Sequence, residues 1–203
     1  VRRFGEEMLF LDLKDQNREA ISGCEAKNIV TADPHAYNAL KNEYDEMVPV
    51  SHISELALRE VKAGRLKLKE VSDKNKIYTY HDPCYLGRHN GIYSDPRDLI
   101  DAIPGTNRVE MVKNSDRSFC CGGGGLMLYY EPAEDTRMGI LRVQMAKDAG
   151  ATVIVTACPF CLVNIQDAVK TLDLDGEIEI IDIAELVDQH MEKTDKNHIH
   201  SDA

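Results

Sequence analysis

The sequence predicts an α/β protein with largely parallel sheets, built from two related units of which the first is partial. Apolar, β-branched segments alternate with segments of helical period along the 203 residues, as in strands joined by crossover helices. The stretch 29–36, IVTADPHA, also resembles 154–161, IVTACPFC. A second echo links ISEL at 53–56 to IAEL at 183–186. Such repetition indicates two copies of one structural unit, and the first copy shows only its second half.

The individual elements follow from these patterns. We expect strands around residues 28–31, 77–80, 109–112, 152–156 and 178–181. We expect helices at about 5–22, 34–45, 54–63, 95–103, 134–149, 159–171 and 183–192. Pro34, Pro96 and Pro159 stand in the first turn of three of these helices, where proline is accepted because its missing N–H is not needed.

Two charged or polar segments lie outside these elements. Residues 64–76, GRLKLKEVSDKNK, predict a linker or an exposed hairpin. A polar tail begins at about Lys193 and is expected to be frayed. We interpret His198 and His200 as part of this tail and not as site residues.

Composition excludes several classes of protein. Hydrophobic residues make up 43% and charged residues 29% of the chain, which is typical of a globular protein. The net charge of −11 disfavours nucleic acid or an anionic membrane as the main partner. No apolar run is long enough to cross a bilayer. The chain opens on Val1 instead of Met, so we expect a piece of a longer protein whose other parts can include a membrane segment.

Five of the six cysteines form a pattern across the second unit: Cys84, Cys120, Cys121, Cys158 and Cys161. Each follows the carboxyl end of a predicted strand, and ligands of open α/β sheets gather outside that edge. Neighbouring cysteines are poorly placed to form a disulfide with each other, and nothing indicates secretion. The thiols are therefore expected to be metal ligands or redox groups.

Three kinds of site are compatible with these thiols. Zinc takes four ligands, commonly from two Cys-x-x-Cys pairs, but this chain has one such pair, one adjacent pair and a single cysteine. Cys158 and Cys161 alone would suit a thioredoxin-like redox pair at the start of a helix. An iron–sulfur cluster also suits soft thiolates. Gly122 and Gly123, in SFCCGGGG, would let backbone N–H groups approach its sulfides.

Four further residues have simpler interpretations. Cys24 has no partner at matching spacing and is expected to be a small buried residue. His81 is interpreted as a hydrogen-bonded structural residue at the end of a strand. Arg88 and Arg137 are interpreted as partners in surface ion pairs, although either could face cluster charge.

The cysteine spacing and the segments YHDPCYLGRHNGIYSDPRDLI, SFCCGGGG and TACPFCLVN resemble the cysteine-rich CCG domain of heterodisulfide reductase-like iron–sulfur oxidoreductases. The resemblance is greatest to the membrane-associated type linked to electron-transfer flavoprotein and quinone. It implies a [4Fe-4S] cluster, cubane or non-cubane, bound by Cys84, Cys120, Cys121, Cys158 and Cys161. It also implies redox partners: ferredoxin-like clusters, an electron-transfer flavoprotein and a haem-bearing membrane part. The expected location is the cytoplasm or the inner face of the membrane.

The resemblance also divides the chain. Residues 1–70 would be the second half of a degenerate unit, residues 76–193 an intact CCG domain, and residues 194–203 a flexible tail. Asp33 and Ala36 stand where the first unit would have its Cys-x-x-Cys pair, so we expect no cluster there.

Three functions remain as hypotheses. The first is an electron-transferring iron–sulfur oxidoreductase subunit. The second is the catalytic subunit of a disulfide reductase, which the degenerate first unit disfavours. The third is a zinc-stabilised interaction module without enzymatic activity.

Overall fold

The structure is a computed structural model that describes residues 1–203 except 46, 126, 128–129, 131–136 and 193–203. The strands are β1 (Ile29–Thr31), β2 (Val50–His52), β3 (Ile77–His81), β4 (Asn107–Val109), β5 (Val153–Thr156) and β6 (Glu179–Asp182). They form a two-stranded sheet, β1-β2, and a four-stranded sheet in the order β4-β3-β5-β6. Every pairing within these two sheets is parallel. The α/β class and the parallel sheets are confirmed.

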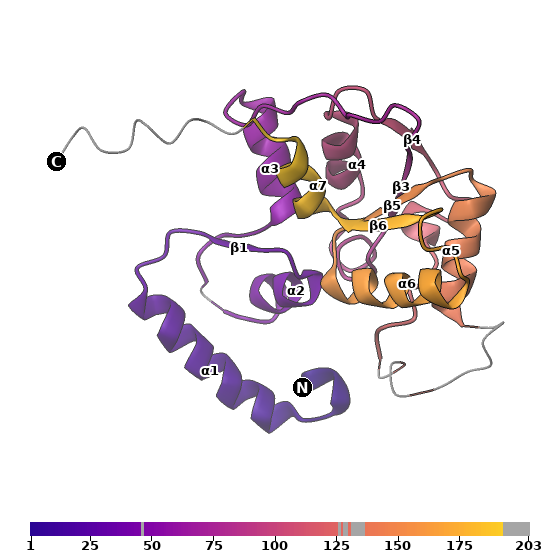
Figure 1. Cartoon of the computed structure of the whole chain (residues 1–203). Coiled ribbons are helices and arrows are strands. Elements are labelled where there is room, and N and C mark those ends of the chain that lie inside the picture. The colour runs from indigo at the N-terminus through magenta and orange to yellow at the C-terminus, as the bar shows by residue number, and fades with distance from the viewer. Residues whose placement is uncertain (46, 126, 128–129, 131–136, 193–203) are drawn as a thin grey trace.

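Helices alternate with the strands (Figure 1). They are α1 (Glu7–Gly23), α2 (Pro34–Asn42), α3 (Ile53–Lys62), α4 (Ser94–Asp101), α5 (Met138–Asp148), α6 (Pro159–Thr171) and α7 (Ile183–His190). Two short 3₁₀ turns, η1 (Arg2–Phe4) and η2 (Ser115–Arg117), complete the described elements. Each of the three prolines lies in the first turn of its helix, as predicted.

The four-stranded sheet has a hydrophobic core on each face. Successive residues of β5 point to opposite faces, so Val153 and Val155 contribute to one core and Ile154 to the other. The first core is closed by α3, α4 and α7, and the second by α5 and α6. Because α3 comes from the first unit, the two units share the first core. The entirely buried, β-branched β5 is typical of a central strand in a parallel sheet.

Local sequence explains how α3 begins. The side chain of His52 accepts a hydrogen bond from the backbone N–H of Ser54, and Glu55 accepts one from the backbone N–H of His52. This reciprocal pair is a capping box, and it starts the helix directly after β2. Asp182 caps α7 at the matching place in the second unit, by accepting from the N–H of Ala184.

Several predicted boundaries were wrong. The strand expected at 109–112 ends at Val109, because its pairing with β3 stops there and Met111 turns into the second core. Residues 64–76 connect α3 to β3 as a linker, the first of the two alternatives, and not as a hairpin; Lys69 and Val71 in this linker donate backbone hydrogen bonds to His190 and Pro104. The first residues of the helix expected at 134–149 lie outside the described residues, as does the tail with His198 and His200.

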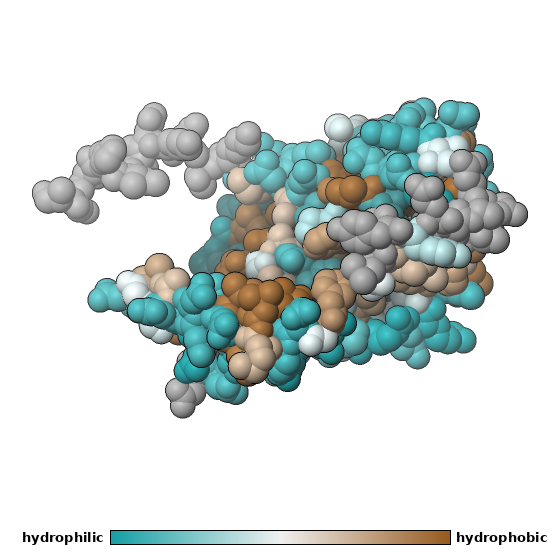
Figure 2. Space-filling model, turned by 90° about the horizontal axis from the view of Figure 1, so that it is seen from below, coloured by the Kyte–Doolittle hydropathy of each residue, from teal (hydrophilic) through white to brown (hydrophobic). Residues whose placement is uncertain are grey.

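Helix α1 differs from the other helices in its packing. It precedes β1 as α5 precedes β5, yet α1 contains no buried residue. Figure 2 shows apolar side chains gathered on the side seen from below, where α1 lies. The exposed apolar residues of η1 and α1 include Phe4, Met8, Leu9, Leu11 and Leu13. Among the described helices, none combines the length and apolar character needed to cross a membrane.

Candidate metal centre

The five cysteines of the second unit lie at the carboxyl edge of the four-stranded sheet. Cys84 follows β3, Cys120 and Cys121 follow η2, Cys158 is the N-cap of α6, and Cys161 lies in the first turn of α6. Four of them line one small pocket together with His81 and Arg88. The fifth, Cys158, is hydrogen-bonded to Cys161. The fold therefore gathers thiols from three separate segments of the chain, while a hollow of about 580 Å³ lies beside the opposite edge of the sheet.

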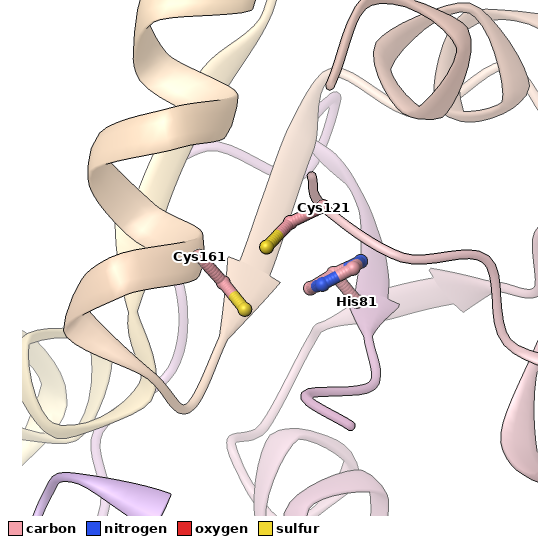
Figure 3. Close-up of side chains that lie close together, drawn as sticks. All are labelled: His81, Cys121 and Cys161. Atoms are coloured by element: carbon pink, nitrogen blue, oxygen red, sulfur yellow. The ribbon is translucent and has the colours of Figure 1, made fainter. Parts of the chain in front are cut away.

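His81, Cys121 and Cys161 form the centre of this group. Figure 3 shows His81 at the end of β3, Cys121 on a loop and Cys161 on α6, with their side chains directed toward one another. One ligating atom from each lies within 4.8 Å of the other two. All three residues are buried. The pocket has about 10 Å³ of free volume, roughly the space that one water molecule needs.

The thiols strongly perturb one another's acidity. Hydrogen bonding from Cys120 lowers the pKa of Cys121, and the same contact raises the pKa of Cys120. Hydrogen bonding from Cys161 lowers the pKa of Cys158 to about 5. The pKa of Cys161 is raised, first by hydrogen bonding to Cys121 and then by hydrogen bonding to Cys158. Cys121 and Cys158 are therefore the favoured thiolates, and neighbouring S–H groups donate to both. A metal ion would replace the retained protons, because thiolates are the ligating form.

A buried arginine orients His81. The Arg142 side chain is fully buried, and its Nε–H donates to His81 Nδ1 at 2.9 Å. Arginine has donors only, so Nδ1 of His81 is an acceptor and Nε2 carries the proton. His81 therefore presents an N–H donor to the sulfurs of Cys121 and Cys161. Burial lowers the pKa of Arg142 to about 10, which leaves it a buried positive charge close to anionic sulfur.

A buried ion pair holds the loop before Cys84. Asp82 is 3% exposed, and its two carboxylate oxygens accept from Arg97 at 2.6 and 2.9 Å. The backbone N–H of Ser115 donates to the same carboxylate at 2.9 Å. Asp82 thereby ties the end of β3 to η2, the turn that leads to Cys120. Arg88 reinforces the link by donating to the carbonyl oxygen of Ser118 at 2.8 Å.

The glycines after Cys121 bring backbone N–H groups to sulfur. Gly122 donates to the sulfur of Cys120, and Gly123 to the sulfur of Cys121, each at 3.3 Å. Gly122 has a φ of +87°, a backbone conformation that residues other than glycine rarely adopt. A Cβ on Gly122 would also lie 3.0 Å from Met138 Cβ. Asn164 closes the loop from α6 by donating to the carbonyl oxygen of Cys121.

We predict that alanine at Gly122 or Gly123 lowers the midpoint potential of the redox centre or its occupancy. Alanine at Gly122 would be strained by the positive φ and crowded by Met138, which disturbs an N–H···S bond, whereas a Cβ on Gly123 would meet ordinary contacts at 3.5 Å and should have a smaller effect. Such bonds stabilise the reduced, more negative state. Gly125→Ala should have a smaller effect. Gly124→Ala is the cleaner control, because a Cβ there meets nothing within 4 Å and Gly125 has a φ of +61°. Redox titration would contradict the prediction if all four variants behaved like the wild type.

The remaining sequence predictions have mixed outcomes. Cys24, predicted to be buried, is exposed at the end of α1. The reason is that α1 buries no residue, so the S–H of Cys24 contacts only local backbone, the carbonyl oxygen of Ala20. His81 is buried and hydrogen-bonded, as predicted, but it also contacts the cysteine group. Arg137 forms the predicted surface ion pair, with Asp167.

The first unit supplies residues that the sequence interpretation missed. Asp33 and Ala36 occupy the positions that match Cys158 and Cys161, as the alignment of the repeats indicates. His35, between them, lies with Asp33 next to Cys158, and one ligating atom from each is within 4.8 Å of the others. In the sequence, only the position of His35 in the segment that repeats the cysteine motif indicated that it could lie near the site. Arg142 and Asn164 gave no signal, because a single polar residue in a helix does not reveal which way it faces.

Comparison with known protein families bears directly on this arrangement. Residues 78–166, which include all five of the converging cysteines, match the CCG cysteine-rich domain. This segment belongs to the CCG family. The matched segment runs from β3 into α6.

Curated relatives extend the likeness beyond the CCG domain. The chain is 37% identical over 191 residues to the probable iron-sulfur-binding oxidoreductase FadF of Bacillus subtilis, covering 93% of this chain and 27% of FadF. It is 37% identical over 202 residues to the EtfAB:quinone oxidoreductase of Syntrophomonas wolfei, covering 95% and 28%. It is 34% identical over 182 residues to one subunit of the dihydromethanophenazine:CoB–CoM heterodisulfide reductase of Methanosarcina barkeri, covering 87% and 44%. The chain therefore spans less than half the length of each of these relatives.

Proposed function

We propose that the chain is the part of an iron–sulfur oxidoreductase that binds one [4Fe-4S] cluster and transfers electrons through it. The proposed ligands are Cys84, Cys120, Cys121, Cys158 and Cys161. The observation that carries the proposal is the convergence of these five thiols, from three loops, at one edge of the sheet. When bound, the cluster supplies a centre that accepts and returns single electrons.

The donor set suits an iron–sulfur cluster better than a single metal ion. All five proposed ligands are soft thiols, which favour iron–sulfur clusters, zinc and Cu(I). A tetrahedral zinc ion needs four of them, and adjacent residues such as Cys120 and Cys121 reach two different metal atoms more easily than one. Backbone N–H groups of Gly122 and Gly123 and the buried Arg142 favour an anionic occupant.

One cluster, not two, is proposed for this chain. Asp33 and Ala36 stand in the first unit where the second has thiols, and a carboxylate is a hard ligand that is poorly suited to iron among soft sulfides. The domain division stays a prediction: a degenerate unit at 1–70, the CCG domain at 76–193 and a tail at 194–203. In this division the first unit is a structural partner without metal.

We further propose that the electrons come from an electron-transfer flavoprotein and pass to quinone. The name of the Syntrophomonas wolfei relative contains both partners, and this chain aligns with it over 95% of its residues. Ferredoxin-like clusters and a haem-bearing membrane part would then belong to other segments or subunits. The protein would work in the cytoplasm or at the inner face of the membrane.

Heterodisulfide reduction is the second candidate, favoured by the likeness to a subunit of the Methanosarcina barkeri reductase. The resemblance implies that this reaction uses two clusters together, and the thiol-free first unit counts against it. A zinc-stabilised interaction module is the third candidate. It would be colourless and contain no sulfide.

The proposed function is tested with the anaerobically purified full-length protein. Electron paramagnetic resonance should show the cluster becoming reduced when reduced electron-transfer flavoprotein is added, and reoxidised by a quinone. The heterodisulfide of coenzymes M and B should leave the reduced signal unchanged. Reoxidation by the heterodisulfide together with no response to the flavoprotein would favour the second candidate instead.

A further inference from the structure

Matching positions of the two units contact each other beside the candidate site. His35 in α2 and Phe160 in α6 occupy equivalent places in the repeat, and their rings meet edge to face with centroids 5.3 Å apart. The equivalent helices α3 and α7 also pack against each other. Contacts between equivalent positions are typical of two units related by a two-fold axis. His35, which matches Phe160 in the repeat, therefore lies near the thiols of the second unit.

Asp33 fixes the orientation of the His35 ring. The Asp33 Oδ1 atom accepts from the backbone N–H of His35 at 2.9 Å and lies 2.9 Å from Nδ1 of the same residue. A carboxylate only accepts hydrogen bonds, so Nδ1 of His35 carries a proton. Nε2 is the ring nitrogen left for another partner. Cys158, which is 1% exposed, lies beside the ring: one ligating atom each of Asp33, His35 and Cys158 is within 4.8 Å of the other two.

Aromatic contacts hold the ring in this position. Tyr85, which directly follows Cys84, lies against His35 with ring centroids 4.4 Å apart. His89 stacks on Tyr85 as well, at 4.5 Å, but its side chain is exposed. The half-buried His35 ring is thus contacted by residues from the start of α2, from the Cys84 loop and from α6.

We propose that His35, oriented by Asp33, is a positioning residue that donates a hydrogen bond to the sulfur of Cys158 and so adjusts the potential of the redox centre. This inference rests on the proposed function, in which Cys158 is a cluster ligand. Both groups that face the ring, the Asp33 carboxylate and the Cys158 thiolate, are acceptors, so both ring nitrogens act as donors. The first unit then contributes to the site without binding metal.

The expected effect on the potential follows from the charge of the cluster. Hydrogen bonds to ligand sulfur stabilise the reduced, more negative state of a cluster. Loss of the donor should therefore make the cluster harder to reduce.

The test compares three variants of the full-length protein by redox titration, after iron and sulfide have been measured in each. His35→Phe keeps an aromatic ring but has no N–H, and it should lower the midpoint potential at unchanged iron content. His35→Gln keeps a donor and should restore the potential toward that of the wild type. His89→Phe removes a histidine ring from the same aromatic stack and should cause no shift.

Each outcome bears on one claim. An iron-loaded wild type with an unshifted His35→Phe variant would overturn the role of His35 alone. Loss of iron in His35→Phe, with iron retained in His35→Gln and His89→Phe, would mean that His35 secures the cluster instead of adjusting its potential, and would also overturn the inference. If His35→Phe does not fold, Asp33→Asn replaces it, with a smaller shift expected in the same direction. A wild type without iron would overturn the proposed function, and this inference with it.

Discussion

Replacing Cys121 with serine should remove most of the iron and acid-labile sulfide from the anaerobically purified protein. Cys121 is 5% exposed, is directed toward Cys161 and His81 (Figure 3), and accepts the N–H of Gly123. A serine hydroxyl is a hard, weakly acidic group and a poor substitute for a thiolate among soft ligands. Metal analysis and the visible absorption of the cluster measure the effect.

Cys24→Ser is the matched control for this experiment. Cys24 is exposed at the end of α1, and its S–H contacts the carbonyl oxygen of Ala20. The iron and sulfide content should therefore equal that of the wild type. The ligand assignment would be wrong if Cys24→Ser lost the cluster while Cys121→Ser retained it.

Replacing Arg97 with methionine should lower the free energy of unfolding by about 3–5 kcal/mol, the usual cost of leaving a buried charge without its partner. Methionine keeps much of the volume of the side chain. It leaves the carboxylate of Asp82, which is 3% exposed, without its bidentate partner. Glu110, which also accepts from Arg97, loses a donor as well. Urea unfolding of the metal-free protein measures the effect without a contribution from the cluster.

Arg65→Met is the control for charge loss alone. Arg65 makes two hydrogen bonds to Glu60, but this pair lies on the surface, where ion pairs contribute little to stability. Its unfolding midpoint should match that of the wild type. If both variants unfolded at the wild-type midpoint, Asp82 and Arg97 would not be holding the loop before Cys84.

The strength of the repeat and strand patterns explains which parts of the fold could be predicted. The segments VIVT at 153–156 and IVT at 29–31 are β-branched and apolar, and both form parallel strands. The short β2 could not be located, because three residues carry no clear alternation. The strand predicted at 109–112 was misplaced because the apolar residue Met111 packs into the second core and does not belong to a strand.

The cysteines of the candidate site could be predicted from their positions after the predicted strands. The rule that ligands gather at the carboxyl edge of parallel strands was enough to bring Cys84, Cys121 and Cys161 together. The surroundings of the thiols were not predictable in this way. His35 reaches Cys158 only through the packing of one unit on the other, and Arg142 reaches His81 only because α5 covers the second face of the sheet. Such contacts depend on tertiary structure that a motif does not encode.

Anomalous X-ray scattering from crystals of the protein, prepared without oxygen, tests the central claim most directly. At the iron absorption edge we predict a single group of peaks, surrounded by the sulfurs of Cys84, Cys121, Cys158 and their neighbours. One peak that appears at the zinc edge and not at the iron edge would contradict the iron–sulfur assignment. A second, separate group of iron peaks, bound by residues of the first unit and away from these sulfurs, would contradict the account of the first unit as a partner without metal.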